Sequence, residues 1–305
     1  MQEISEYNGC GIHAYSEDLL EEYERKIRTG LPGRIPQHIP PGQPNGVQEE
    51  YDNYSCCFII TQKYSRNYKS YIKSYVDNIK RFYSNHFIII VDNNSNNLED
   101  VQSLFVDYTN MVILVNDSPS KFELGGFIYG LKWLIQHDKI NSYDYYVFSQ
   151  DTLVMINKYD LNILKSNNIT ACVMVEFDQN TSGLRGYLDE EKKQVLDTIG
   201  LYGHNDKITL CWGSNCIITN TKILQFYHYI KDLILTVKKD SEVAERYMAR
   251  IIYELNNHSN FNIDGFMFDY YAKFDKNRTE IDHDNRNIYF QKFHQFKNEH
   301  LQRMN

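Results

Sequence analysis

The stretch FIIIVDNNSNN, residues 87–97, joins a continuous apolar run to an abrupt polar end at Asp92. Similar apolar runs lie before and after it and alternate with segments of helical periodicity: CCFIIT (56–61), MVILVN (111–116) and YYVFS (145–149). Strands that are apolar along their whole length are typical of a parallel sheet with helices on both faces. The pattern therefore predicts an α/β fold with a doubly wound, mixed but mostly parallel sheet flanked by helices.

The segments between and after these runs predict the remaining elements. Apolar residues recur at helical spacing in five segments, namely 68–83, 98–107, 124–137, 222–238 and 241–255. Two more apolar runs, ACVMVEF (171–177) and CWGSNCIIT (211–219), predict further strands. We expect these elements to form one domain over residues 51–305.

The first 50 residues follow a different pattern. Residues 16–30 predict a helix, with Ser16 as N-cap and Gly30 as its stop. Five of the six prolines fall between 32 and 44, which predicts an extended arm with polyproline character. Such an arm can cover the following domain, link it to something else or dock a partner, and the sequence leaves these alternatives open.

Composition excludes several classes of protein. The net charge is −8 and the basic residues are dispersed, so we expect no nucleic-acid partner. No apolar run is long enough to span a membrane, and the N-terminus lacks the features of a signal peptide, so we expect a cytoplasmic protein without a transmembrane segment. The six cysteines show no metal-ligand spacing, and we expect reduced thiols in the core.

Two carboxylates stand at predicted strand ends, where open α/β sheets bind ligands. Asp92 and the following Asn94 end the second strand, and a carboxylate there can accept hydrogen bonds from a nucleoside. The alternative is plain turn chemistry. Asp151 follows the fourth strand in YDYYVFSQDTLVM (143–155), between two apolar stretches. A charge there needs compensation, and Mg²⁺ or Mn²⁺ on a diphosphate would supply it, whereas a helix cap is the alternative.

A third feature is the glycine pair in ELGGFIYGLKWL (123–134). Gly125 and Gly126 near a helix start would let the backbone approach a ligand closely, and Glu123 could contact a hydroxyl group. Close packing of the helix on the sheet explains the pair equally well.

The order of these features resembles the nucleotide-sugar domain of GT-A glycosyltransferases over about residues 54–255. V-D-N-N-S is similar to the V-D-D-G-S element of the inverting, family-two-like group, and Ser149-Gln150-Asp151 stands where that family has a D-x-D triad. The resemblance implies that Asp92 holds the nucleobase and that Asp151 holds the metal on the diphosphate. It also implies that the donor is surrounded by Thr61, Asn94, Gly125, Ser149 and Gln150. Ser149 replaces the first acid of the triad, which leaves metal dependence open.

The same resemblance divides the domain into a nucleotide-binding half (51–155) and an acceptor half (156–305). SEVAERYMARIIYEL (241–255) resembles an E-R-containing helix of several bacterial and viral transferases, so Glu242 and Glu245 are candidates for the catalytic base. A surface ion pair between Glu242 and Arg246 is the alternative. Near the C-terminus, His283 is a candidate metal ligand and Lys292 a candidate residue closing over the diphosphate.

The resemblance thus implies a glycosyltransferase that moves a sugar from a nucleoside diphosphate sugar, a UDP-sugar first among these, to a hydroxyl of a glycan, protein or small-molecule acceptor. From the same resemblance we expect metal assistance and inversion, while Ser149 leaves metal dependence open and the residues themselves do not distinguish inverting from retaining transfer. Two other classes stay open. Ser149 favours a degenerate GT-A domain that binds nucleotide sugar or glycan without turnover. A nucleotidyltransferase should carry a glycine-rich basic loop after the first strand, where TQKYSRN (61–67) has no glycine.

Overall fold

Strands and helices alternate along the first half of the domain, as the periodicity predicts. The computed structural model describes residues 54–63, 69–162, 164, 168–178, 207–257, 263 and 290–292. The strands are β1 (Cys56–Gln62), β2 (His86–Asp92), β3 (Met111–Val115), β4 (Tyr145–Gln150), β5 (Leu153–Met155), β6 (Ala171–Asp178), β7 (Lys207–Thr219) and β8 (Phe290–Lys292). The helices are α2 (Lys69–Phe82), α3 (Leu98–Leu104), α4 (Phe122–Gln136), α8 (Asn220–Ile230) and α9 (Lys238–Leu255). The predicted N-terminal helix and proline-rich arm lie outside these residues.

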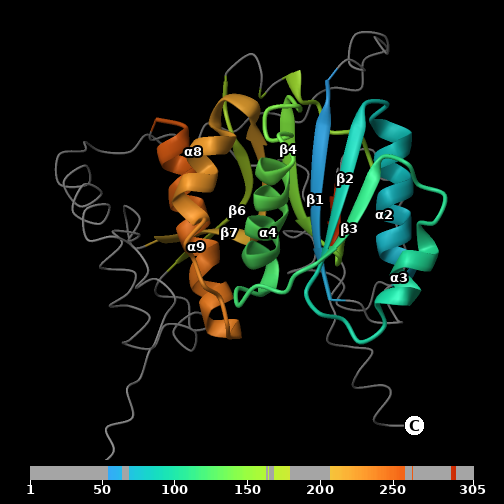
Figure 1. Cartoon of the computed structure of the whole chain (residues 1–305). Helices are drawn as coiled ribbons and strands as arrows, with labels where there is room; N and C mark the ends of the chain where they lie inside the picture. Colours follow the sequence, from blue (N-terminus) through green and yellow to red (C-terminus); the bar gives the residue numbers. More distant parts are fainter. Residues whose placement is uncertain are drawn as a thin grey trace, which may run out of the picture.

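Six strands form one mixed sheet in the order β3-β2-β1-β4-β7-β6 (Figure 1). The neighbours from β3 to β4 are parallel, while β7 runs antiparallel to β4 and β6 antiparallel to β7. This arrangement confirms the predicted fold class. The carboxyl ends of β1, β2, β3 and β4 consequently meet at one edge of the sheet, which we call the carboxyl edge.

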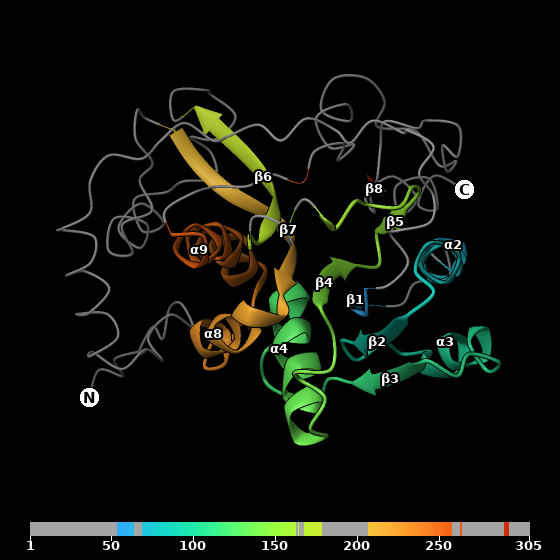
Figure 2. The ribbon, with the colours of Figure 1, turned by 90° about the horizontal axis from the view of Figure 1, so that it is seen from above.

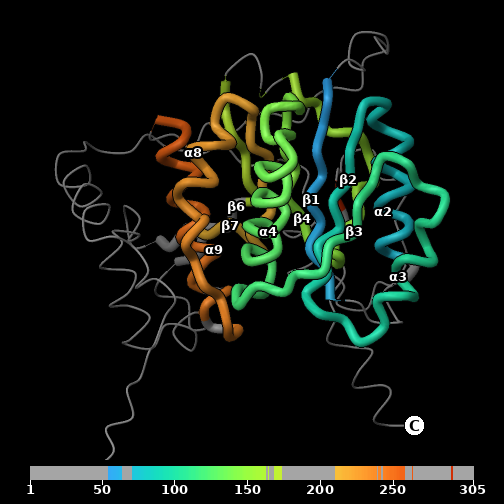
Figure 3. The backbone as a smooth tube through the Cα atoms, viewed as in Figure 1, coloured from blue at the N-terminus to red at the C-terminus, as the bar shows by residue number. Residues whose placement is uncertain are grey.

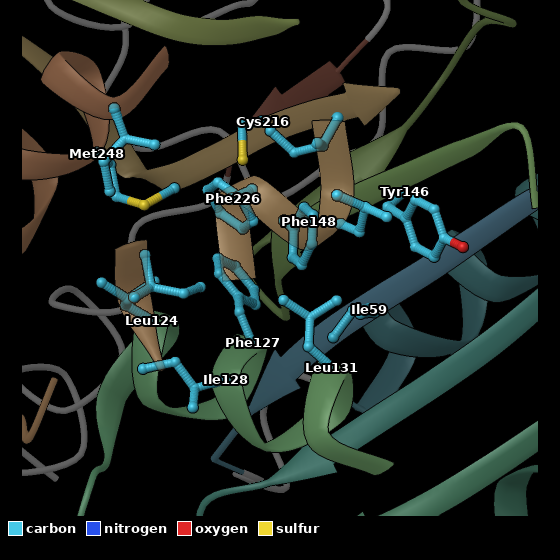
Figure 4. Packing of buried hydrophobic residues seen from close by; sticks show 14 of the residues in the cluster. Ile59, Leu124, Phe127, Ile128, Leu131, Tyr146, Phe148, Cys216, Phe226 and Met248 are labelled. Carbon is cyan, nitrogen blue, oxygen red and sulfur yellow. The ribbon is translucent and has the colours of Figure 1, made fainter. Parts of the chain in front are cut away.

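The sheet separates two apolar clusters, because successive residues of a strand point to opposite faces. In β1, Cys57 and Ile59 belong to the cluster under α4, α8 and α9, whereas Phe58 and Ile60 belong to the cluster under α2 and α3. Figure 2 shows these two groups of helices on opposite faces. In the first cluster, Phe127 of α4 contacts Phe148 of β4 edge to face (Figure 4). Both faces are therefore buried, which explains the uninterrupted apolar runs.

The prediction of one helix over 222–238 was wrong about where that helix ends. α8 ends at Ile230, and an extended connection leads to the start of α9 at Lys238. The two helices α8 and α9 lie side by side (Figure 3). Leu235 in this connection is buried and accepts a hydrogen bond from the main-chain N–H of Lys121, 2.7 Å away. Its own N–H donates to Ser120 Oγ at 3.1 Å. These bonds to the loop before α4 replace the helical bonds that the periodicity predicts.

The described cysteines are free and buried, as expected of core residues. Burial raises the pKa of the Cys56 thiol to about 12, and it also raises the pKa of the Cys57 thiol well above its ordinary value. Thiols of this kind stay protonated and unreactive. Among the described ranges, no helix has the length and apolar character needed to cross a membrane.

Candidate nucleotide-sugar site

The turn after β2 is organised around Asp92, which is 1% exposed. Its Oδ1 accepts hydrogen bonds from Gln62 Nε2 (3.1 Å) and Ser95 Oγ (2.5 Å), and its Oδ2 accepts one from the Ser95 main-chain N–H (2.7 Å). These donors compensate a carboxylate that is removed from water. Asp92 therefore has the turn-stabilising role considered as the alternative above, and its contact with a nucleoside stays a prediction.

The same turn is fastened to the start of α4. Asn94 is exposed and adopts a left-handed conformation with φ 64°, which asparagine tolerates better than most residues. Asn93 Nδ2 donates to the carbonyl oxygen of Phe122 at 2.9 Å, and Asn116 Nδ2 donates to Asn93 Oδ1 at 2.8 Å. Asn116 is almost fully buried. The polar residues after β2 and β3 thus form one connected network at the carboxyl edge.

Asp151 joins the end of β4 to the loop after β1. Its main-chain N–H donates to the carbonyl oxygen of Thr61 at 2.9 Å, and its Oδ2 accepts a hydrogen bond from the main-chain N–H of Lys63 at 3.1 Å. Asp151 as a whole residue is 8% exposed and is therefore buried. The structure therefore brings Asp151 and Thr61 together, as their predicted shared site requires.

Ser149 points toward α2, on the face of the sheet that α2 covers. Tyr75 donates a hydrogen bond from its hydroxyl to Ser149 Oγ at 3.0 Å, and both residues are buried. Burial raises the pKa of Tyr75, so its hydroxyl stays protonated. A carboxylate at position 149 would lie against this tyrosine in the apolar cluster under α2. The serine is consequently well suited to the core, which gives a physical reason for the missing acid.

Gln150 faces a bulge in β7 that the sequence did not mark as functional. Gly213 and Ser214 there both have φ 57°, and a Cβ on Gly213 would lie 1.8 Å from Gln150 Nε2. The main-chain N–H of Gly213 donates to Glu245 Oε1 at 3.1 Å, and Gln150 Nε2 lies 3.5 Å from the Gly213 carbonyl oxygen. Gly213 thus places the Glu245 carboxylate of α9 near the end of β4. Its requirement for a left-handed glycine depends on tertiary neighbours and carries no local signal.

The glycine pair of α4 is explained by close packing. A Cβ on Gly125 would lie 2.6 Å from the Ser120 carbonyl carbon, and one on Gly126 would lie 2.2 Å from Thr61 Cγ2. Glu123 accepts a hydrogen bond from Ser241 Oγ at 2.9 Å and so joins the starts of α4 and α9. The helix must therefore approach β1 closely here, and the ligand contact expected of Gly125 stays a prediction.

The remaining predicted residues are placed only in part. β8 pairs with β5 and sets Lys292 opposite Leu153, two residues beyond Asp151. The backbone of Glu242 lies in the first half of α9, but its side chain is outside the described part, and so is all of His283. Within the described ranges, no three histidine, cysteine or acidic side chains are grouped closely enough to hold a metal ion.

Comparison with known proteins gives distant structural similarity. No family model matches this sequence, and no curated protein matches it. The bifunctional glycosyltransferase WbbM is 16% identical with a TM-score of 0.39, over 72% of this chain and 40% of that chain. TarS of S. aureus in complex with UDP is 9% identical with a TM-score of 0.37, over 65% of this chain and 55% of that one. The 4-diphosphocytidyl-2C-methyl-D-erythritol synthase of Anaerococcus prevotii is 12% identical with a TM-score of 0.39, over 69% and 86%. This chain spans less than half of WbbM, and because each of these three TM-scores is below 0.5, the fold class rests on the strand order and strand directions described above.

Proposed function

We propose that this protein is a glycosyltransferase that uses a nucleoside diphosphate sugar, with a UDP-sugar as the first donor to test. One observation carries the proposal: Asp92, Asp151 and Glu245 come from three distant parts of the sequence and lie at the carboxyl edge of one mostly parallel sheet. Ligands of such sheets bind at this edge. The order of the residues along the chain is also the order in which the GT-A pattern places the nucleoside, the diphosphate and the base.

The candidate residues at the site suit a divalent cation that binds together with the nucleotide sugar. Mg²⁺ and Mn²⁺ prefer oxygen ligands, and Mg²⁺ is often held by one or two carboxylates together with substrate phosphates and water. Asp151 would be the carboxylate ligand, with His283 as a further ligand and Lys292 closing over the diphosphate. A bound cation would neutralise charge on the departing diphosphate.

Glu245 is the proposed catalytic base, with Glu242 as the other candidate. The carboxylate takes the proton of the acceptor hydroxyl while the oxygen of that hydroxyl forms a bond to the anomeric carbon. The bond from that carbon to the diphosphate oxygen breaks, and the electron pair leaves with the diphosphate. Attack on the face opposite the leaving group inverts the configuration. The Gly213 N–H would hold the Glu245 carboxylate in place during this step.

The loop after β1 distinguishes this function from nucleotidyl transfer. A nucleotidyltransferase on this architecture needs a glycine-rich loop with basic residues to bind the triphosphate of its substrate. The sequence TQKYSRN at 61–67 contains no glycine. This difference favours transfer of the sugar over transfer of the nucleotide.

The proposal is tested by incubating the protein with UDP-, GDP- and TDP-sugars in Mn²⁺ and measuring release of the nucleoside diphosphate, with and without candidate acceptors. We expect release with at least one donor, and loss of that release in Glu245→Gln. The glutamine retains an oxygen for the Gly213 N–H but cannot take a proton. An exposed glutamate of α3, Glu99→Gln, is the matched control. Binding of nucleotide sugar without any release would show a binding module instead.

A further inference from the structure

Gln62 is the last residue of β1 and lies directly beside Asp92 in the parallel register. It is 2% exposed, and its Nε2 donates to Asp92 Oδ1 at 3.1 Å. A carboxylate only accepts hydrogen bonds, so the amide nitrogen must face Asp92. The carbonyl oxygen, Oε1, is therefore held on the other side of the amide group. The Gln62 amide thus has one fixed orientation, whereas the amide of an exposed glutamine can rotate.

Asp92 itself is engaged by the protein. Its two oxygens accept three hydrogen bonds, two of them from Ser95. Gln62 Oε1, by contrast, has no hydrogen-bond donor among the residues that the structure describes. The negative charge behind the amide also polarises it and strengthens Oε1 as an acceptor. Gln62 is thus the acceptor that this corner of the carboxyl edge can offer a ligand.

We propose that Gln62 reads the nucleobase of the donor by accepting a ring N–H through Oε1, with Asp92 as the positioning residue that orients the amide. This inference rests on the proposed nucleotide-sugar function and specifies its substrate class. Uracil, thymine and guanine carry a ring N–H on their pairing edge. Adenine and cytosine present a ring nitrogen lone pair there, which the carbonyl oxygen and the carboxylate behind it would repel. The class is therefore a nucleotide with a ring N–H, such as UDP.

The test is calorimetric binding of UDP, GDP, CDP, ADP and 3-methyl-UDP to the full chain in Mn²⁺. The methyl group removes the ring N–H and leaves the rest of UDP unchanged. We expect UDP or GDP to bind about tenfold or more tightly than CDP and ADP, and 3-methyl-UDP to lose about tenfold relative to UDP, as for one buried hydrogen bond left unmade.

Gln62→Leu should weaken UDP binding by about tenfold and leave the affinity for 3-methyl-UDP unchanged. The variant should therefore bind the two nucleotides with equal affinity. Gln136→Leu is the matched control, because this exposed glutamine ends α4 at the opposite edge of the sheet. Equal binding of UDP and 3-methyl-UDP by the wild-type protein would overturn the inference even if Gln62→Leu does not fold. It would leave the proposed function standing, whereas failure of every nucleotide to bind would overturn both.

Discussion

The carboxyl ends of β2 and β4 each carry a buried aspartate, and the protein holds the two carboxylates in different ways. Asp92 accepts hydrogen bonds from Ser95, three residues further on, and from the neighbouring strand. Asp151 accepts one from the main-chain N–H of Lys63, which is 88 residues away in the chain. The first carboxylate belongs to the structure of its own turn, and the second ties two strand ends together. Charge should therefore matter most for function at Asp151 and for folding at Asp92.

The largest effect that this difference predicts is on activity at Asp151. Asp151→Asn keeps an oxygen that can accept from the Lys63 N–H but removes the negative charge. Release of nucleoside diphosphate should fall about a hundredfold or more, as for the loss of one preorganised electrostatic contact of about 3 kcal/mol. The midpoint temperature of thermal unfolding should be unchanged or slightly higher than that of the wild type. Asp107→Asn, at an exposed aspartate after α3, is the control that should keep full activity.

Restoring the missing acid should fail, because position 149 faces α2. Ser149→Asp would place a carboxylate against Tyr75 in an apolar cluster and should destabilise the fold by about 3 kcal/mol. Ser149→Ala, which removes only the hydrogen bond, should cost about 1 kcal/mol. Chemical denaturation measures both changes. An aspartate variant as stable as the wild type and with higher Mn²⁺ affinity would show that position 149 reaches the site.

Asp92→Ala should affect both folding and binding. Two donors of Ser95 and one of Gln62 would lose their acceptor, so we expect a loss of about 1.5–3 kcal/mol in the free energy of unfolding. The affinity for nucleotide should fall roughly ten- to hundredfold, because the Gln62 amide is no longer oriented. Denaturation and calorimetry on the same sample separate the two effects. Unchanged nucleotide affinity would show that Asp92 does not contribute to the nucleotide site.

The smallest effect is expected from deleting residues 1–46. Every candidate for donor binding lies after residue 60, so the shortened chain should fold and bind nucleotide as the full chain does. Circular dichroism and calorimetry test this. Loss of cooperative unfolding would show that the proline-rich arm is part of the core.

Parts of the fold and of the candidate site follow from local sequence, and other parts do not. The strands of the six-stranded sheet and the Asp92 turn were predictable because an apolar run and the V-D-N-N-S turn are local patterns. The roles of Gln62 and Gly213 were not, since they depend on Asp92, Gln150 and Glu245, which are distant in the chain. The end of α8 was missed for the same reason, because its extended continuation is bonded to the loop before α4. Local chemistry predicts the strand ends, and tertiary contacts decide which of their side chains face a ligand.

The pairing of β5 with β8 is a further tertiary feature that no local pattern indicated. It brings Lys292, which the sequence analysis named as a candidate for closing over the diphosphate, to the strand that follows Asp151. Its contact with a diphosphate stays a prediction, as does the role of His283. A role for His283 as a metal ligand depends on the central claim that Asp151 binds a cation together with the donor.

That claim is tested most directly by calorimetric titration of UDP into the wild-type protein and Asp151→Asn, each in Mn²⁺ and in EDTA. The wild type should bind about tenfold or more tightly in Mn²⁺ than in EDTA, and the variant should bind weakly and equally in both. Equal binding by the wild type in Mn²⁺ and EDTA would contradict the account. In that case the site would be metal-free, and basic side chains such as Lys292 would have to neutralise the diphosphate.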